Sequence, residues 1–260
     1  MTVPAVAPVD GLARATWIQA GRALRRSLRM PTVVVQGLAF PLVLMLLLLA
    51  GFREVVGDFD PTRDHVQRLV PMAAVTGAVF GGLANGAGLI SERRMGLLDR
   101  FRALPSPRLA PLTGRVLAEA ARIALGTVVL VLVAMVVGFR FSGGVLGALA
   151  FVPVVVVYGT SFAWLVTALA VRATAFEQLS LLGPLFLVLL FFNTGFVPLD
   201  AFPGALQPLV RSSPHTAVSD ALLGLSDGGP VAGPLLRTLL WSAAITAVSA
   251  TTAVRRFRAT

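Results

Sequence analysis

Six long apolar stretches limit what this chain can fold into more than any other feature of its sequence. Each is long enough for the roughly 20 residues that a helix needs to cross about 30 Å of hydrocarbon. Only 13% of the residues are charged, against about 25% in soluble domains. The sequence therefore predicts an all-α membrane protein with six transmembrane helices, over residues 32–52, 69–90, 116–138, 145–171, 179–199 and 235–254.

The positions of the basic residues predict which side of the membrane each connection faces. All 22 are Arg, a usage that favours a bacterium with a GC-rich genome. Fifteen lie before the first stretch and after the second, fourth and sixth stretches, whereas five lie in the other connections. The positive-inside rule makes the first set cytoplasmic. We therefore expect a multi-pass protein of the bacterial plasma membrane with both termini in the cytoplasm, and no nucleic acid is needed to explain the basic charge.

Several residue types are missing, and their absence excludes whole classes of site. A P-loop needs a Lys beside the terminal phosphates of ATP, and the chain contains only Arg as a basic residue. It has no Cys and two His, so thiolate metal sites and zinc enzymes of the H-E-x-x-H kind are excluded as well. We therefore expect no catalytic residue, no metal and no cofactor bound by this chain.

The central parts of the six stretches contain no ionisable side chain. Such groups are costly in a membrane and usually carry function there. Glu119 and Arg122, near the start of the third stretch, are expected to pair with each other because they stand three residues apart. An ion-coupled carrier, a channel with charged rings and an intramembrane hydrolase would all lack their essential groups. Transport by this chain would therefore need energy from another protein.

Residues 11–30 have the pattern of an amphipathic helix that ends at Pro31. An apolar stripe beside a basic face is typical of a helix in the membrane interface. We therefore expect residues 1–31 to form a cytoplasmic tail and an interfacial helix; the alternative is a basic tail that only holds the topology. The stripe consists of Trp17, Gly21, Leu24 and Leu28, and the basic face of Arg14, Arg22, Arg25, Arg26 and Arg29.

The second stretch is rich in glycine. Gly77 and Gly81, and likewise Gly82 and Gly86, stand at the G-x-x-x-G spacing that lets helix backbones approach closely in lipid. The pattern predicts tight packing but does not identify the neighbouring helix.

The connection after the second stretch has the pattern of a short amphipathic helix. Leu97, Phe101 and Leu104 recur at i, i+4 and i+7, with Arg residues on the other side and Pro105 as a stop. Attachment to the membrane surface is one interpretation. Docking of a soluble protein is the other, and Asp99 favours it because an acidic residue gains nothing from an anionic membrane.

The connection over residues 196–234 is too apolar for a free outer loop. Backbone polar groups must be satisfied near lipid, so we expect short interfacial or re-entrant helices interrupted by proline. The residues that mark this outer segment are Gly195, Pro198, Pro203 and Pro214.

In these two connections the chain resembles the type-2 ATP-binding-cassette (ABC) transporter permeases, including the daunorubicin-resistance exporter permeases. The six-span topology and the basic N-terminus fit as well. Arg94 departs from the family, which often has a second acidic residue there. The first match is Glu92-Arg93-Arg94 with Gly96-Leu97-Leu98-Asp99-Arg100-Phe101 and Pro105; the second is Gly195-Phe196-Val197-Pro198, Phe202-Pro203, Leu206-Gln207 and Pro214-His215-Thr216.

The resemblance implies a permease without ATPase activity of its own. Two copies of a separate cytoplasmic ABC ATPase subunit would bind ATP and Mg and dock on a coupling helix over about 92–104. A second permease chain, identical or a sister, would complete the transporter in the lipid membrane. The coupling residues implied are Glu92, Arg93, Gly96, Leu97, Leu98, Asp99, Arg100, Phe101 and Pro105.

Neutral polar side chains in the spans are candidates for a translocation path, although interhelical hydrogen bonding explains them equally well. An apolar wall suits lipid-like or amphipathic drug-like cargo moved outward. The alternatives are a membrane anchor or assembly protein that transports nothing, and an ion-coupled carrier or channel. The candidates are Asn85, Tyr158, Ser161, Asn193 and Thr194.

Overall fold

The computed structural model is helical throughout the part of the chain that it describes, which comprises residues 11–28, 31–51, 65–96, 109–172, 179, 181–195 and 199–259. The all-α prediction is confirmed for those residues. The helices are α1 (Leu12–Leu28), α2 (Pro31–Gly51), α4 (His65–Arg94), α6 (Ala110–Val136), α7 (Gly144–Arg172), α9 (Leu182–Phe191), the short 3₁₀ helix η1 (Leu199–Ala201), α10 (Gln207–Ser212), α11 (Pro214–Asp227) and α12 (Ala232–Ala259).

Three of these helices are long and apolar enough to cross a membrane. They are α4, α6 and α7, which correspond to the second, third and fourth predicted stretches. The other three stretches are represented by α2, α9 and α12. The protein is therefore a membrane protein with at least these three spans.

The helix of the fifth stretch is shorter than the sequence predicts. α9 ends at Phe191 rather than near residue 199, and Phe192 leaves helical geometry with φ of −89° and ψ of 61°. The side chain of Asn193 then accepts a hydrogen bond from the backbone N–H of Gly195 at 2.6 Å. Asn and Gly favour such turns because a short polar side chain can replace backbone hydrogen bonds. The apolar run of the sequence continues beyond Phe191, but the helical conformation of the backbone ends there.

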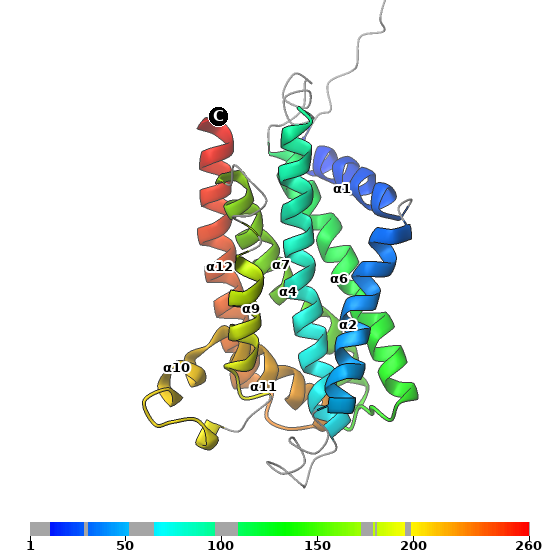
Figure 1. Ribbon diagram of the computed structural model, residues 1–260, viewed down its shortest axis with the longest axis vertical. Helices are drawn as coiled ribbons and strands as arrows, with labels where there is room; N and C mark the ends of the chain where they lie inside the picture. The colour runs from blue at the N-terminus through cyan, green and yellow to red at the C-terminus, as the bar shows by residue number, and fades with distance from the viewer. Residues whose placement is uncertain are drawn as a thin grey trace, which may run out of the picture.

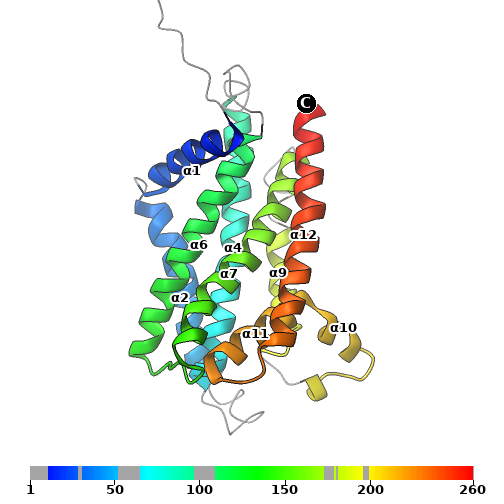
Figure 2. The ribbon, with the colours of Figure 1, turned by 180° about the vertical axis from the view of Figure 1, so that it is seen from behind.

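The long helices run side by side, and the two ends of the bundle differ (Figures 1 and 2). At one end α1 lies across the bundle, close to where α6 begins, and α4 and α12 finish at the same end, α12 on the side away from α1; we call this the α1 end. At the opposite end, the α11 end, lie α10 and α11. Because α4 packs against α2, α6, α7, α9 and α11, it forms the centre of the core.

The glycines of α4 identify the neighbours that the sequence pattern left open. A Cβ atom at Gly77 would lie 2.7 Å from Cβ of Pro41 in α2, and one at Gly86 would lie 2.8 Å from a methyl carbon of Leu179. At Gly82 the nearest atoms belong to the backbone of Ala163 in α7. Small residues therefore allow α4 to approach α2 on one side and α7 on another.

The packing face of α1 is made of small residues, and its Trp faces away from the bundle. Ala15 and Ala20 are buried, whereas the side chain of Trp17 is 72% exposed. A Cβ atom at Gly114 of α6 would lie 2.9 Å from the backbone oxygen of Thr16. α1 therefore has a third face, for close contact with α6, beside the apolar stripe and the basic face that its sequence predicts.

At the α11 end, the helix α11 is almost completely buried. Ser213 caps its first turn by accepting a hydrogen bond from the backbone N–H of His215 at 3.2 Å, and Pro214 occupies the first helical position. Gly228, with φ of +79°, ends the helix in the left-handed conformation that favours glycine. α11 packs against α4, α7 and α12, so this connection is part of the core.

Candidate functional site

The candidate site lies at the α1 end, where α4 stops and α6 begins. α4 continues through Arg94, so Glu92 and Arg93 lie in its last turn rather than in a separate helix. Gly96, with φ of +67°, follows in the left-handed conformation that commonly ends helices. The other predicted coupling residues lie outside the described part of the chain: Leu97, Leu98, Asp99, Arg100, Phe101 and Pro105.

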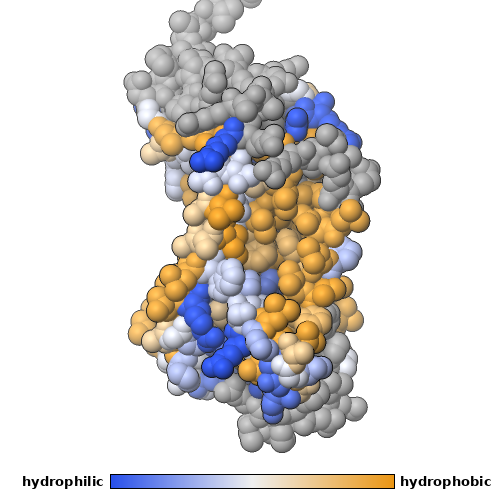
Figure 3. Space-filling view, turned by 90° about the vertical axis from the view of Figure 1, so that its left-hand side faces the viewer, coloured by the Kyte–Doolittle hydropathy of each residue, from blue (hydrophilic) through white to orange (hydrophobic). Residues whose placement is uncertain are grey.

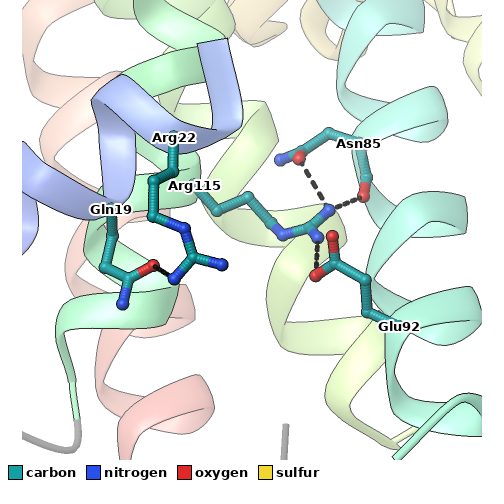
Figure 4. A network of polar contacts seen from close by, with 5 residues as sticks. All are labelled: Gln19, Arg22, Asn85, Glu92 and Arg115. Carbon is teal, nitrogen blue, oxygen red and sulfur yellow. Dashed lines mark hydrogen bonds and ion pairs between the residues drawn. The ribbon is translucent and has the colours of Figure 1, made fainter. Parts of the chain in front are cut away.

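Arg115 joins α6 to α4 (Figure 4). Its Nη2 atom forms an ion pair with Oε2 of Glu92. Its Nη1 atom donates to the backbone oxygen of Asn85 at 2.8 Å and to the side-chain Oδ1 of the same residue at 3.2 Å. The side chains of Arg115 and Glu92 are only 14% and 21% exposed, so salt screens the pair less than an exposed one. One guanidinium thus contacts α4 over about two helical turns.

Charged groups of α6 lie along one face of α4, in a row that we call the polar seam. A Cβ atom at Gly88 would lie 3.1 Å from Nη1 of Arg115, and one at Gly81 would lie 2.9 Å from Oε1 of Glu119. These two glycines therefore leave room for charged side chains. The seam consists of Gly81, Asn85, Gly88 and Glu92 of α4 with Arg115, Glu119 and Arg122 of α6.

The ion pair predicted between Glu119 and Arg122 is confirmed. Glu119 is 2% exposed, and Arg122 is 29% exposed. Because a buried carboxylate without a partner would be strongly destabilising, Arg122 is what allows Glu119 to lie in the core. Unlike the pair formed by Arg115, this pair lies within a single helix.

The last turn of α4 also contacts α7. Nη1 of Arg93 donates to the backbone oxygen of Val171 at 3.0 Å. Val171 lies in the last turn of α7, where backbone carbonyls have no partner within the helix. Two adjacent residues, Glu92 and Arg93, therefore join the end of α4 to α6 and to α7.

α1 contacts the same turn of α6 that carries Arg115. The hydroxyl oxygens of Thr16 and Thr113 are 2.8 Å apart, and Gly114 receives the close approach of α1 described above. Within α1, Arg22 donates to Oε1 of Gln19 at 3.4 Å (Figure 4). The consecutive residues 113–115 thus bring α1 and α4 to one turn of α6.

Two of the candidate path residues lie in the core of α7. Tyr158 is fully buried, and its hydroxyl is 3.0 Å from Nδ1 of His215 in α11. Ser161 is also fully buried and donates to the backbone oxygen of Tyr158 at 2.6 Å. Edge-on contacts of Phe162 with Phe186 and with the His215 ring enclose the group. Hydrogen bonds between protein groups account for these two polar side chains.

Two further candidates follow α9 at the α11 end. Asn193 is fully buried and holds the turn at Gly195. Thr194 donates to Oδ1 of Asp220 at 2.7 Å, and Arg237 of α12 lies 3.5 Å from the other oxygen of that carboxylate. These contacts join the segment after α9 to α11 and α12. Asn85, the fifth candidate, accepts from Arg115, while its buried Nδ2 atom has no hydrogen-bond partner among the described residues.

Burial shifts the pKa values of two groups in α11. It lowers the pKa of His215 from 6.5 to about 4, so the imidazole is neutral at pH 7. It raises the pKa of Asp220, while the hydrogen bond from Thr194 and the charge of Arg237 act in the opposite direction. The Asp220 carboxylate is therefore held between a desolvating core and two groups that stabilise its charge.

The sequence interpretation missed Arg115 and His215. It placed Arg115 in the connection before the third span, but α6 begins at Ala110 and includes it. The spacing of Arg115, Glu119 and Arg122, at i, i+4 and i+7, was the signal for one face of a longer helix. His215 was assigned to an outside loop, yet it is 1% exposed because α11 is part of the core. The apolar pattern of residues 196–234 indicates that this connection is not a free loop, but it does not single out His215 as buried.

The surface between the two ends is apolar (Figure 3). Figure 3 shows an apolar band across the middle of the face formed by α9 and α12, with hydrophilic residues toward both ends. Large apolar side chains on this face are more than half exposed, for example Val188 in α9 and Leu240 in α12. In water such a band would be unfavourable, whereas hydrocarbon or another apolar protein surface covers it at no cost.

The described residues contain no candidate metal site. Among them, no group of three or more His, Cys, Asp or Glu side chains lies close enough together to hold a metal. The α1 end instead connects four helices, α1, α4, α6 and α7, within a few turns of one another. These turns include the two points at which the chain enters and leaves the segment 97–108.

Comparison with known proteins identifies relatives along nearly the whole chain. Residues 14–225 match the family of the ABC-2 type transporter. The probable doxorubicin resistance ABC transporter permease protein DrrC of Mycobacterium tuberculosis, found in two strains, is 32% identical over 241 residues, which cover 90% of this chain and 85% of the relative. The daunorubicin resistance ABC transporter permease protein DrrB1 of Streptomyces coeruleorubidus is 28% identical over 274 residues, covering 99% and 96%.

Proposed function

This chain belongs to the ABC-2 type transporter family as a permease component, and we propose that it forms the membrane path of an ATP-driven exporter whose ATPase is a separate protein. The family match over most of the chain carries the proposal. The chain's lack of Lys agrees with it, since a P-loop on this chain would have no Lys for the phosphates of ATP.

The proposed membrane topology has six spans, with α2, α9 and α12 joining the three long apolar helices. The α1 end faces the cytoplasm. Support comes from the Arg residues, fifteen of which belong to the N-terminal segment before α2, the ends of α4 and α7, the segment between α4 and α6, the start of α6, and the C-terminus. In this orientation the exposed Trp17 and the basic face of α1 meet the lipid interface.

Energy would enter through the segment 97–108 of each permease chain. In this proposal, two permease chains and two ATPase subunits form the transporter, and the ATPase subunits bind ATP and Mg. Closure of the ATPase pair displaces the coupling segments. The junction of α1, α4 and α6 at residues 113–115 and the last turn of α4 receive that displacement because the segment 97–108 connects α4 to α6.

The proposed cargo is an amphipathic, drug-like molecule with a large apolar part. The relatives' names associate them with doxorubicin and daunorubicin resistance, and the apolar band of Figure 3 offers such a molecule no charged barrier. Lipid-like cargo has the same chemistry. Among the five candidate path residues, Asn85 is the one whose buried Nδ2 donor is free to bind cargo.

The experiment is ATP-dependent uptake of daunorubicin by inverted membrane vesicles that contain this chain and its ATPase. We expect uptake only when both proteins and ATP are present. Phe101→Asp, which puts a charge on the apolar side of the predicted coupling helix, should abolish uptake. The matched control is Leu209→Asp, the same kind of change at an exposed position of the α11 end. Uptake by the permease without the ATPase, or normal uptake by Phe101→Asp, would contradict the proposal.

A further inference from the structure

The two places where the segment 97–108 joins the bundle are held together by one side chain. The segment leaves the described structure after Gly96 and re-enters it at Leu109. Glu92 lies one turn before the first point, and Arg115 lies between one and two turns after the second. Their ion pair therefore closes the base of the connection between α4 and α6.

Arg115 is suited to this task by its geometry. A guanidinium presents several N–H donors in a rigid plane, whereas the ammonium of Lys is a point charge. Here Nη2 pairs with the Glu92 carboxylate, and Nη1 donates to the backbone and side-chain oxygens of Asn85. The side chain thus fixes both the distance between the two helices and their position along each other.

The helix α4 leaves space for this side chain. Gly88 lies between Asn85 and Glu92 on the same face, and a Cβ atom there would lie 3.1 Å from Nη1 of Arg115. A larger residue at position 88 would displace the guanidinium. The arrangement is therefore specific to an Arg lying flat along α4.

The ends of α4 and α6 are connected in turn to the rest of the α1 end. Arg93 joins α4 to the last turn of α7, and Thr113 and Gly114 join α6 to α1. A displacement that reaches the base of the segment 97–108 is shared by four helices, provided that the base does not open.

We propose that Arg115 is the positioning residue that holds the base of the coupling segment closed, so that movement of the segment displaces α4 and α6 together instead of separating them. The inference rests on the proposed function, because it assumes that the ATPase acts on this segment. Glu92 is the partner that the ion pair requires, and Asn85 fixes its register. Without the pair, ATP would be hydrolysed while the displacement is lost in the connection.

The first measurement concerns the base itself and needs no transport. The sequence has no Cys, so Met95→Cys and Leu109→Cys introduce the only two labelling sites of this chain, at the two ends of the connection, and the spin labels are attached before the ATPase is added. In the full chain with its ATPase we expect a narrow distance distribution. Arg115→Glu should broaden it, and the exchange Glu92→Arg with Arg115→Glu should narrow it again, because the pair re-forms with its charges reversed. An unchanged distribution in Arg115→Glu would overturn the inference.

The second measurement is the amount of daunorubicin moved per ATP hydrolysed. For Arg115→Glu we expect this ratio to fall roughly tenfold, within the range typical of coupling between two sites, while ATP hydrolysis itself changes by less than about twofold. The double exchange should recover much of the ratio, and Arg115→Lys should lie between. A residue with a merely structural role would lower transport and hydrolysis in parallel, and such a parallel loss would contradict the proposal.

Two controls separate the inference from its alternatives. Arg140→Glu makes the same charge reversal beyond the opposite end of α6, where the side chain contacts only backbone oxygens of its own segment, and should leave the ratio unchanged. Arg237→Gln removes a more exposed ion pair at the α11 end and should leave the label distances narrow. A wild-type complex that hydrolyses ATP but moves no daunorubicin would contradict the proposed function; the label distances would then still decide whether Arg115 holds the base.

Discussion

The two ends of this bundle use polar side chains in opposite ways. At the α1 end, the pair of Arg115 and Glu92 joins two long helices that flank the segment 97–108. At the α11 end, hydrogen bonds from Tyr158 and Thr194 hold a short buried helix against its neighbours. The first arrangement links the two helices that the proposed coupling segment connects, whereas the second closes the bundle.

The glycines sharpen this difference. At the α11 end, a Cβ atom at Gly147 would collide with the backbone oxygen of Leu225. At the α1 end, a Cβ atom at Gly88 would meet the tip of the Arg115 side chain. A helix backbone cannot move aside without moving the helix, but a side chain can turn. The contact of α7 with α11 at Gly147 is therefore rigidly packed, and the contact of Gly88 with Arg115 can adapt; the α1 end also contains one backbone contact, at Gly114, where α1 meets α6.

The largest effect is expected from Gly147→Ala. The added methyl group must push α7 away from α11, so the loss in free energy of unfolding should reach or exceed the upper part of the roughly 1–3 kcal/mol typical of overpacked cores. Thermal unfolding in detergent measures it. Gly183→Ala is the matched control, since no atom lies within 4 Å of its new Cβ. Equal midpoints for the two variants would mean that the α11 end is not rigidly packed.

Acidification should destabilise the α11 end through His215. The unfolded chain binds a proton there near pH 6.5, but the folded chain does so only near pH 4. Between these values the unfolded state holds more protons, so the free energy of unfolding falls as pH falls, by up to about 3 kcal/mol. Burial raises the pKa of Asp220. In the acidic part of this range the folded state therefore holds more protons at Asp220 than the unfolded state, and this group increases the free energy of unfolding as pH falls.

The difference between wild type and His215→Gln isolates the histidine. Unfolding midpoints from pH 7 to pH 4 should fall more steeply for wild type than for the variant, which has no titratable group at that position. Parallel curves would show that His215 is not buried in its neutral form.

A smaller loss is expected from Thr194→Val. The change removes the hydroxyl that donates to Asp220 while keeping the shape of the side chain. The expected loss is about 1 kcal/mol, typical of one hydrogen bond, measured as the denaturant midpoint. A matched change is Thr251→Val, whose hydroxyl bonds only backbone oxygens of its own helix. If Thr194→Val loses no more stability than Thr251→Val, the hydrogen bond of Thr194 does not help to hold α11 in place.

The smallest effect on stability is expected from Gly88→Ala. The Arg115 tip can shift by a few tenths of an ångström, and Ala favours the helix by up to about 1 kcal/mol over Gly, so the unfolding midpoint should hardly change. The ratio of daunorubicin moved to ATP hydrolysed should nevertheless fall. If Gly88→Ala loses as much stability as Gly147→Ala, the two ends do not differ in how tightly their glycines are packed.

The positions of the helices followed from the sequence because hydrocarbon leaves few alternatives for a long apolar run. α2 covers 31–51 where 32–52 is expected, and α7 covers 144–172 where 145–171 is expected. The differences are α4 and α6, which begin at His65 and Ala110 where 69 and 116 are expected, and α9, where Asn193 and Gly195 end the helix inside an apolar run. The hydropathy of this stretch reflects its apolar side chains, but it does not predict the turn that ends the helix.

Pairwise contacts could not be predicted in the same way. The pair of Glu119 and Arg122 was predictable because both residues lie on one helix, three positions apart. The pair of Glu92 and Arg115 joins two helices, and its register depends on how α4 and α6 pack. Likewise the glycine spacing of α4 indicates close packing, but only the arrangement of its neighbours assigns Gly77 to α2 and Gly88 to Arg115.

Because the final turn of α4 is attached on both flanks, through Glu92 to α6 and through Arg93 to α7, these three helices form a single lever. A rigid group of helices can tilt about one fixed point. Here that point is the close packing of α7 against the backbone of Leu225 at the α11 end. Under the proposed function, a displacement of the segment 97–108 would tilt these three helices together against α9, which contacts them mainly through α4. We would then expect the path for cargo to open between α4 and α9.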